Sequence, residues 1–224
     1  FWSLLNPILQ LAVIATVFSY VVRQGIRDYT QYLFSGLLAW NFFQSTLQMS
    51  STSILENENF IKKIYLPKML FPLSKLCLRG IDFVFAFFAL SIIGAFVGFH
   101  YYPSMIMLPL AIVLLFAFTF GLSLLVAVGT VYFRDIQYLM GVFLQLLYFA
   151  TPIMYSEDLL PEKFRAILGL NPFLALLNLF HKIIYFGQFP TTSEWALATM
   201  LSIISVGLGI SVLKHLEEDL VFRL

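Results

Sequence analysis

The stretch ILENENFIKKIYLPKMLFPLSKLCLRG, residues 54–80, is the one densely charged segment between two long apolar segments of the chain. Over residues 54–65 it has helical periodicity, with apolar and charged residues on opposite sides. The apolar side holds Ile54, Ile61, Ile64 and Tyr65, and the charged side holds Glu56, Glu58, Lys62 and Lys63. Pro67 ends the helix by removing a backbone donor, and Pro72 suits the first turn of another. We call residues 54–65 the lever.

The lever can be interpreted in two ways. It is either a solvated amphipathic segment on lipid headgroups or a docking element for a soluble partner. Glu58 precedes Lys62 by four residues, the order that favours an ion pair on a helix and stiffens it.

The composition indicates an integral membrane protein. Of the 224 residues, 60% are hydrophobic and 11% are charged, and the mean hydropathy is +0.89. Soluble domains carry roughly 25% charged residues, so this chain cannot cover a core with a polar surface.

A net charge of +1 without a basic run gives no sign of nucleic-acid binding. One cysteine, Cys77, excludes an internal disulfide. The chain starts at Phe1 in an apolar run, and we expect the natural N-terminus to lie upstream.

Six apolar segments are long enough to span a bilayer, which takes about 20 residues. They cover residues 2–22, 31–53, 69–99, 104–131, 136–155 and 195–213. Between the last two, short apolar runs predict helices over about 161–168 and 171–186 that re-enter the membrane without crossing it. Residues 214–224 form a charged tail. We therefore predict a single all-α membrane domain over residues 1–224.

The basic residues are unevenly shared between the two sides of these spans. On the lever's side lie Lys62, Lys63, Lys68, Lys75, Arg79, Arg134, Lys214 and Arg223. On the other lie Arg23, Arg27, Lys163, Arg165 and Lys182, three of them in a long connection that counts less. The lever, the turn at Arg134 and Asp135 and both termini are therefore predicted to be cytoplasmic.

Two spans carry a polar stripe. The second span has Asn41, Gln44, Ser45, Gln48 and Thr52 at steps of three and four residues. These side chains either join helices within a bundle or line a polar conduit. The fifth span has Gln145, Tyr148, Thr151 and Tyr155 along one face, either a packing seam or a surface over which sugar rings can slide.

Two further pairs lie in the third span. Arg79 and Asp82, three residues apart, predict an ion pair within the membrane. Gly94 and Gly98 form a GxxxG, a helix-packing motif that is common by chance.

Motifs for chemistry are missing from the sequence. It has no GxxxxGK[ST], no HExxH and no Gly-x-Ser-x-Gly, and its three histidines are scattered. Asp82 is the one carboxylate well inside a span, too little for a proton relay. We therefore expect no enzyme activity, metal or cofactor in this chain.

Five blocks in this order resemble the membrane subunit of a type-2 ABC exporter, in the branch that moves polysaccharides and polyol phosphates such as O-antigen, capsule or teichoic acid. They are LLNPILQ (4–10), YLFSGLLAWNFF (32–43), ENENFIKKIYLPKMLFPLS (56–74), VYFRDIQYLMGVFLQLLYFATPIMY (131–155) and LPEKFRAILGLNPF (160–173). Where the family often has Ser-Pro-Ile, this chain has Thr151-Pro152-Ile153, which keeps the hydroxyl.

The resemblance implies a homodimer of six-span subunits in the bacterial cytoplasmic membrane, each bound to a cytoplasmic ATPase subunit that holds ATP and Mg. The lever then resembles the coupling helix, with ATPase contacts at Glu56, Glu58, Lys62, Lys63 and Tyr65. The outer gate would include Pro161, Phe164, Asn171, Pro172 and Phe173. The glycan path would include Asn41, Gln44, Gln48, Gln145, Tyr148, Thr151 and Tyr155, while Arg134 and Asp135 brace the cytoplasmic turn.

Two other functions remain open at this point. Related exporters move small hydrophobic drugs or lipids, which would suit a less polar second span. An intramembrane glycan-modifying enzyme would need acids and histidines gathered at one depth, which the sequence does not provide.

Overall fold

The computed structural model describes residues 26–64, 66–155 and 168–223, together with Leu9, Val13, Pro161 and Lys163. Every regular element in this part is a helix. The elements are α2 (Ile26–Ser51), η1 (Leu55–Asn57), α3 (Glu58–Lys63), α4 (Leu70–Val97), η2 (Pro103–Met107), α5 (Leu108–Tyr132), α6 (Ile136–Ala150), α8 (Pro172–Phe180), the π-helix η4 (His181–Phe186) and α9 (Thr192–Arg223).

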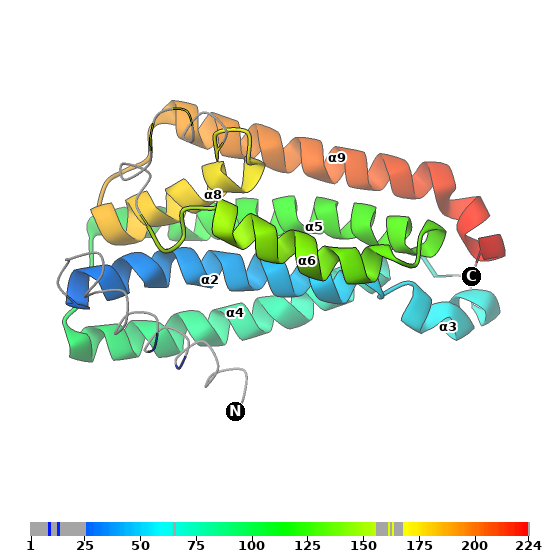
Figure 1. Ribbon diagram of the computed structural model, residues 1–224, viewed down its shortest axis with the longest axis horizontal. Coiled ribbons are helices and arrows are strands. Elements are labelled where there is room, and N and C mark those ends of the chain that lie inside the picture. The colour runs from blue at the N-terminus through cyan, green and yellow to red at the C-terminus, as the bar shows by residue number, and fades with distance from the viewer. Residues whose placement is uncertain are drawn as a thin grey trace.

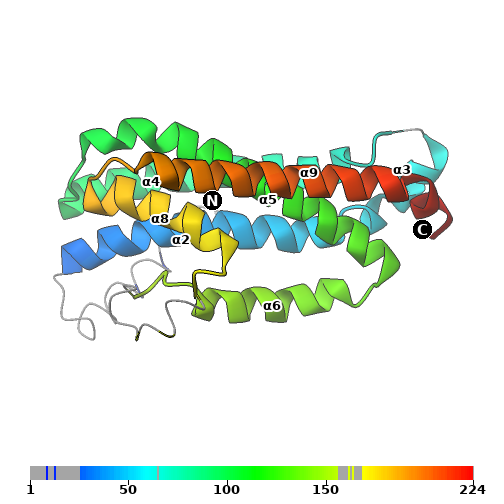
Figure 2. The same cartoon turned by 90° about the horizontal axis from the view of Figure 1, so that it is seen from above.

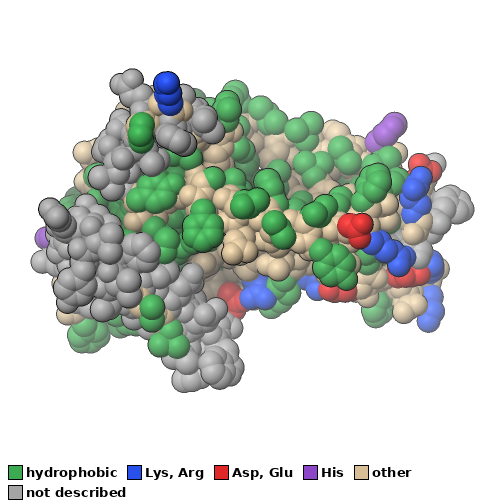
Figure 3. Space-filling model, in the orientation of Figure 1, with side chains coloured by type: hydrophobic (Ala, Val, Ile, Leu, Met, Phe, Trp, Pro, Cys, Tyr) green, Lys and Arg blue, Asp and Glu red, His purple; other side chains and the backbone are tan. Residues whose placement is uncertain are grey.

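The long helices lie side by side and alternate in direction (Figure 1). One end of the bundle therefore carries α3, the α5–α6 turn and the C-terminal end of α9, and we call it the lever end. The other carries the α4–α5 turn, α8 and η4, and we call it the re-entrant end. Charged side chains gather at the lever end, while apolar side chains cover the length of the bundle (Figure 3).

Three of the predicted spans are helices long and apolar enough to cross a membrane: Leu70–Phe96, Pro103–Tyr132 and Thr192–Glu217. The first predicted span lies almost wholly outside the described residues. The second is α2, which is not among these three helices because its polar residues lower its mean hydropathy. It is nevertheless the central helix, with Leu33, Ala39 and Trp40 almost completely buried.

Several predicted boundaries were wrong. The fifth span ends as a helix at Ala150, because Thr151 is extended and Pro152 offers no backbone donor. The charged tail is no separate segment, since α9 continues without a break to Arg223. The lever is not one helix but a 3₁₀ turn followed by the six-residue α3.

The second re-entrant helix is where the sequence predicts it. Asn171 Oδ1 accepts a hydrogen bond from Phe173 N at 3.0 Å, and Pro172 occupies the first turn. The helix widens to a π-helix from His181 and ends at Gly187, whose φ of 64° suits glycine. The predicted helix over residues 161–168 lies largely outside the described residues.

Helix α9 packs against α5 through small residues. A Cβ atom at Gly121 would lie 2.2 Å from the Ser205 carbonyl carbon, and one at Gly209 would lie 2.5 Å from Gly121 O. Ser202 and Ser205 donate to carbonyls of α5, at 3.0 Å and 2.8 Å. The two backbones are therefore in direct contact, as small residues allow in membrane helices.

Candidate functional site

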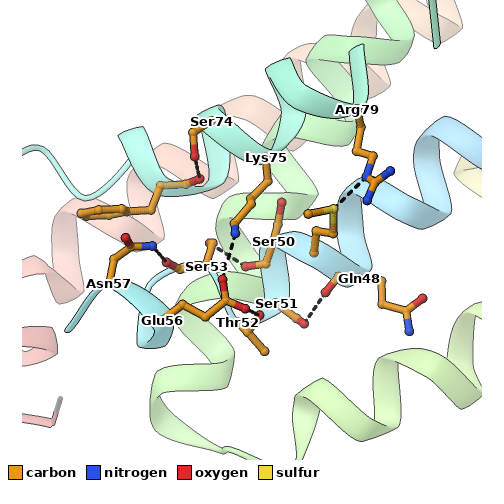
Figure 4. Close-up of polar contacts among 12 residues, drawn as sticks. Gln48, Ser50, Ser51, Thr52, Ser53, Glu56, Asn57, Ser74, Lys75 and Arg79 are labelled. Atoms are coloured by element: carbon orange, nitrogen blue, oxygen red, sulfur yellow. Dashed lines mark hydrogen bonds and ion pairs between the residues drawn. The ribbon is translucent and has the colours of Figure 1, made fainter. Parts of the chain in front are cut away.

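The base of the lever is held between α2 and α4. Glu56 accepts hydrogen bonds from Thr52 Oγ1 at 2.5 Å and from Lys75 Nζ at 2.8 Å (Figure 4). The hydrogen bond from Lys75, followed by that from Thr52, holds the pKa of the Glu56 carboxyl below its ordinary value. Glu56 was predicted as an ATPase contact, and the structure places it in this brace, with its side chain still half-exposed.

Short side chains complete the end of α2. Asn57 Nδ2 donates to Ser53 O at 2.8 Å, and Ser53 Oγ donates to Ser50 O at 2.7 Å (Figure 4). The last carbonyls of a helix receive no hydrogen bond from within the helix. The Ser53 hydroxyl supplies such a bond to the Ser50 carbonyl near the end of α2. Arg79 and Asp82 form the predicted ion pair at 2.8 Å, and Arg79 Nε also contacts Met49 of α2.

The buried side of the lever packs on α5 and α9. Ile54 is completely buried, and Leu55 and Ile61 are partly buried beside it. They share one apolar cluster with Leu124, Ala127, Val128 and Val131 of α5 and with Leu213 and Leu220 of α9. The lever is thus seated on a helix pair remote from it in sequence.

The outer side of the lever combines charges with exposed apolar groups. Lys62 and Glu58 form the predicted ion pair at 2.5 Å, and Lys63 is exposed nearby. Phe60 and Ile64 expose 59% and 56% of their surface. Placing Ile64 on the buried side was wrong, because the helix ends at Lys63 and Ile64 is extended. Tyr65 lies outside the described residues.

Phe60 did not figure among the predicted contacts, although the periodicity contained the signal. It follows Glu56 by four residues and precedes Lys63 by three, which places it on the charged side of the helix. An aromatic residue at such a position is a stronger indication of a partner than the charges around it.

Two residues of the polar stripe, Gln44 and Ser45, form hydrogen bonds within α2. Trp40 Nε1 donates to Gln44 Oε1 at 2.6 Å, and Ser45 Oγ donates to Asn41 O at 2.6 Å. Asn41 and Gln44 are half-buried and Gln48 is exposed. The bonds of Gln44 and Ser45 do not join neighbouring helices, which favours an exposed polar surface over interhelical contact for this part of the stripe.

Helix α6 faces α2 through aromatic rings. The Tyr148 ring lies 5.5 Å from that of Trp40, and Gln145 is exposed. Tyr155 Oη donates to Phe149 O at 3.0 Å, and this side chain is half-buried. Of the predicted stripe, Gln145 and Tyr148 therefore lie on α6, whereas Tyr155 lies beyond its end.

Thr151 has another setting. It is 1% exposed, donates to Leu147 O at 2.6 Å and accepts from Asn171 Nδ2 at 2.9 Å. It therefore joins the end of α6 to the cap of α8 in this conformation, instead of lining a surface.

At the re-entrant end, α8 and η4 are firmly held. Phe173 is buried against the rings of Trp40 and Phe43, at 5.3 Å and 4.5 Å. Gln31, which is 2% exposed, donates to Ile184 O and His100 O and accepts from His100 N, joining α2 to η4 and to the α4–α5 turn.

Other predicted site residues differ in their surroundings. Pro161 and Pro172 are exposed, and Phe164 lies outside the described residues. Arg134 and Asp135 are both exposed in the α5–α6 turn at the lever end. Among the described residues, no three His, Cys, Asp or Glu side chains are placed to hold a metal.

A helical bundle with three membrane-length helices is the architecture of an integral membrane protein. Residues 1–185 match the family model of ABC-2 type transporters, and the chain belongs to this family.

Curated relatives extend this result. An O-antigen export system permease protein, RfbA, of Klebsiella pneumoniae is 32% identical over 79% of this chain and 68% of its own. The RfbA permease of Myxococcus xanthus is 26% identical over 97% of this chain and 85% of its own. The polysialic acid transport protein KpsM of Escherichia coli is 20% identical over the same shares.

Proposed function

We propose that this chain is the membrane subunit of an ATP-driven exporter that moves a polysaccharide or a lipid-linked glycan across the bacterial cytoplasmic membrane. The observation that carries the proposal is the similarity, over 97% of the chain, to permeases named for O-antigen export and for polysialic acid transport. Since the sequence has no nucleotide-binding motif, ATP and Mg belong on a separate ATPase subunit. A homodimer with six spans per chain, cytoplasmic termini and two ATPase subunits completes the assembly.

The lever is the proposed docking site for the ATPase. Phe60 and Ile64 present an apolar surface of the kind that partners bury, and the charges of Glu58, Lys62 and Lys63 surround it. The buried side of the lever is fixed to the bundle, so a partner that binds the outer side moves the bundle with it.

The glycan path is proposed along the facing sides of α2 and α6. Gln44, Gln48 and Gln145 offer hydrogen-bonding groups, and Tyr148 offers an aromatic ring beside Trp40. Amides beside aromatic faces bind a sugar chain weakly enough to let it move. With Thr151 buried, we place it at the joint behind this path.

The experiment is export by the chain reconstituted in lipid vesicles with an ABC ATPase subunit and an O-antigen polysaccharide from the same organism. We expect ATP to drive glycan across the membrane and the glycan to stimulate hydrolysis. Tyr148→Ala should reduce both, whereas Tyr138→Ala, an exposed tyrosine on the same helix, should leave them unchanged. Stimulation by an amphipathic drug but not by glycan would favour the drug-exporter alternative.

The lever is tested in the same vesicles. Phe60→Ala should weaken ATPase binding about tenfold or more, as loss of a central aromatic contact does. Glu58→Ala with Lys62→Ala should uncouple hydrolysis from export while membrane insertion stays normal. Unchanged binding and export in these variants would exclude the lever as the docking site.

A further inference from the structure

The short segment between α3 and α4 is fixed by an ion pair with the far end of the chain. Lys68 Nζ lies 3.2 Å from Glu217 Oε1 of α9, although the two residues are 149 positions apart. Lys68 is only 6% exposed, and Glu217 about a third. A lysine buried to this degree is costly without its carboxylate, so this pair favours one position of the segment. The exposed pair of Glu58 and Lys62 imposes no such constraint.

The last turns of α9 make further contacts at the same end. Leu213 and Leu220 are buried in the apolar cluster that contains Ile54 of the lever. The Arg223 guanidinium carbon lies 4.4 Å from the centre of the Tyr132 ring at the end of α5. These turns were expected to be a charged tail, and instead they form the seat on which the lever rests.

The first turn of α9 makes an equivalent contact at the re-entrant end. Glu194 Oε1 lies 2.5 Å from Lys182 Nζ of the π-helix η4, and Glu194 Oε2 accepts from Thr191 N at 2.8 Å. The 32 residues of α9 extend about 48 Å at 1.5 Å per residue, more than the roughly 30 Å hydrocarbon core. Helix α9 runs from the re-entrant end to the lever end of the bundle (Figure 1). It has one ion pair near each end, one to the lever segment and one to the re-entrant helix.

We propose that α9 is the connecting element of the exporter, with Lys68 and Glu217 as positioning residues that make the lever and α9 move as one body. Lys182 and Glu194 then pass this motion to the re-entrant helix. The inference rests on the proposed function, because it takes the lever as the ATPase contact. Since α9 is fixed to α5 through Ser202 and Ser205, α5 moves with it.

The experiment compares variants of the full complex in lipid nanodiscs and vesicles. Two quantities are measured: glycan exported per ATP hydrolysed, and hydrogen exchange of the backbone amides of α3. Glu217→Gln should lower the first about fivefold, the size of effect that coupling residues commonly have. It should speed exchange in α3 severalfold, because the lever loses its support. The exchange of charges, Lys68→Glu with Glu217→Lys, should restore both to within about twofold.

One further variant tests the ion pair at the other end of α9, and another serves as a control. Glu194→Gln should lower export per ATP with faster exchange in η4 and unchanged exchange in α3. Asp219→Asn removes an exposed acid two residues beyond Glu217 and should change neither quantity.

Two results would overturn the role of Lys68 and Glu217. One is unaltered hydrogen exchange in α3 after Glu217→Gln, and the other is a loss of export per ATP that the double variant with swapped charges does not restore. Normal export per ATP in Glu194→Gln overturns the connection to the re-entrant helix. If the wild-type complex exports no glycan, the proposed function is wrong, and exchange in α3 still decides whether α9 positions the lever.

Discussion

Helices α9 and α6 are both apolar and both flank the central helices, yet they contact the bundle in different ways (Figure 2). Between α9 and α5 the backbones touch at Gly121 and Gly209, and serine hydroxyls donate across the contact. Between α6 and α2 the contact is made by side chains, with the Tyr148 ring beside Trp40 and Leu144 of α6 buried in the same apolar cluster. Two backbones in direct contact leave no room for a larger side chain, whereas side chains in contact can change rotamer.

Both helices expose large apolar side chains on their outward surfaces, which on α9 are Leu197, Met200, Ile203, Ile204 and Leu208. Much of α6 is exposed, including the large side chains of Val142, Phe143, Leu146 and Phe149. On the function proposed above, the backbone contact of α9 suits the transmission of a displacement, and the side-chain contact of α6 suits a surface along which a sugar chain passes.

The largest effect is expected where the backbones touch. Gly209→Leu places a side chain 2.5 Å from Gly121 O, which no rotamer can relieve, and should cost more than about 3 kcal/mol of stability. An added Cβ at Gly207 in the same helix or at Gly141 in α6 meets nothing within 4 Å, so Gly207→Leu and Gly141→Leu should be tolerated. Thermal unfolding in detergent and the monodisperse yield measure the difference. Equal losses in all three variants would contradict the distinction between the contacts.

A smaller effect is expected from the glutamines. Gln31→Leu removes from a buried position the amide that bonds to His100 N, His100 O and Ile184 O, and should cost about 2–3 kcal/mol. Gln145→Leu removes an exposed amide from α6 and should leave stability within about 0.5 kcal/mol. The shift of the unfolding midpoint measures both. Similar shifts would mean that α6 is as firmly held as the re-entrant end.

The smallest effect is a pH dependence at the lever end. The pKa of Glu56 is lowered from 4.5 in the folded chain, mainly by Lys75. Its contribution is therefore complete above pH 4.5 and is lost as the pH falls through the lowered folded pKa. Because the carboxyl is half-exposed, the loss should stay below about 1 kcal/mol.

Unfolding midpoints recorded from pH 6 to pH 3 test this. Both Glu56→Gln and Lys75→Met should flatten the profile slightly. A profile as steep as that of the unaltered chain would show that the brace does not contribute.

The helices could be predicted from the sequence where a long apolar run is bounded by prolines or by a capping residue. The bounds of α4 and α5 and the capped start at Asn171 follow from local pattern. Helical structure was predicted at the lever, but Phe60, which its spacing puts on the charged side, was overlooked. Ile64 was assigned to the apolar side because the end of α3 at Lys63 was not foreseen.

Contacts between remote segments were not predictable in this way. The GxxxG at Gly94 and Gly98 was interpreted as a helix-packing motif. In the structure Gly98 ends α4 with φ 92°, and Gly94 leaves room for the Phe99 ring. The actual close contact uses Ser202, Ser205 and Gly209, whose small side chains matter only once α5 lies against them. For the same reason no local pattern connected Gln31 with η4 or Lys68 with Glu217.

Cys77 is the one cysteine of the chain, and its side chain is exposed on α4 about two turns from the start of the helix. A nitroxide attached there would need no prior removal of other thiols. Its relaxation by oxygen, which concentrates among the acyl chains, against that by a water-soluble nickel chelate would give the depth at which the protein meets the aqueous boundary. In an assembly of two copies, the distance between the two labels would also report the spacing of the subunits.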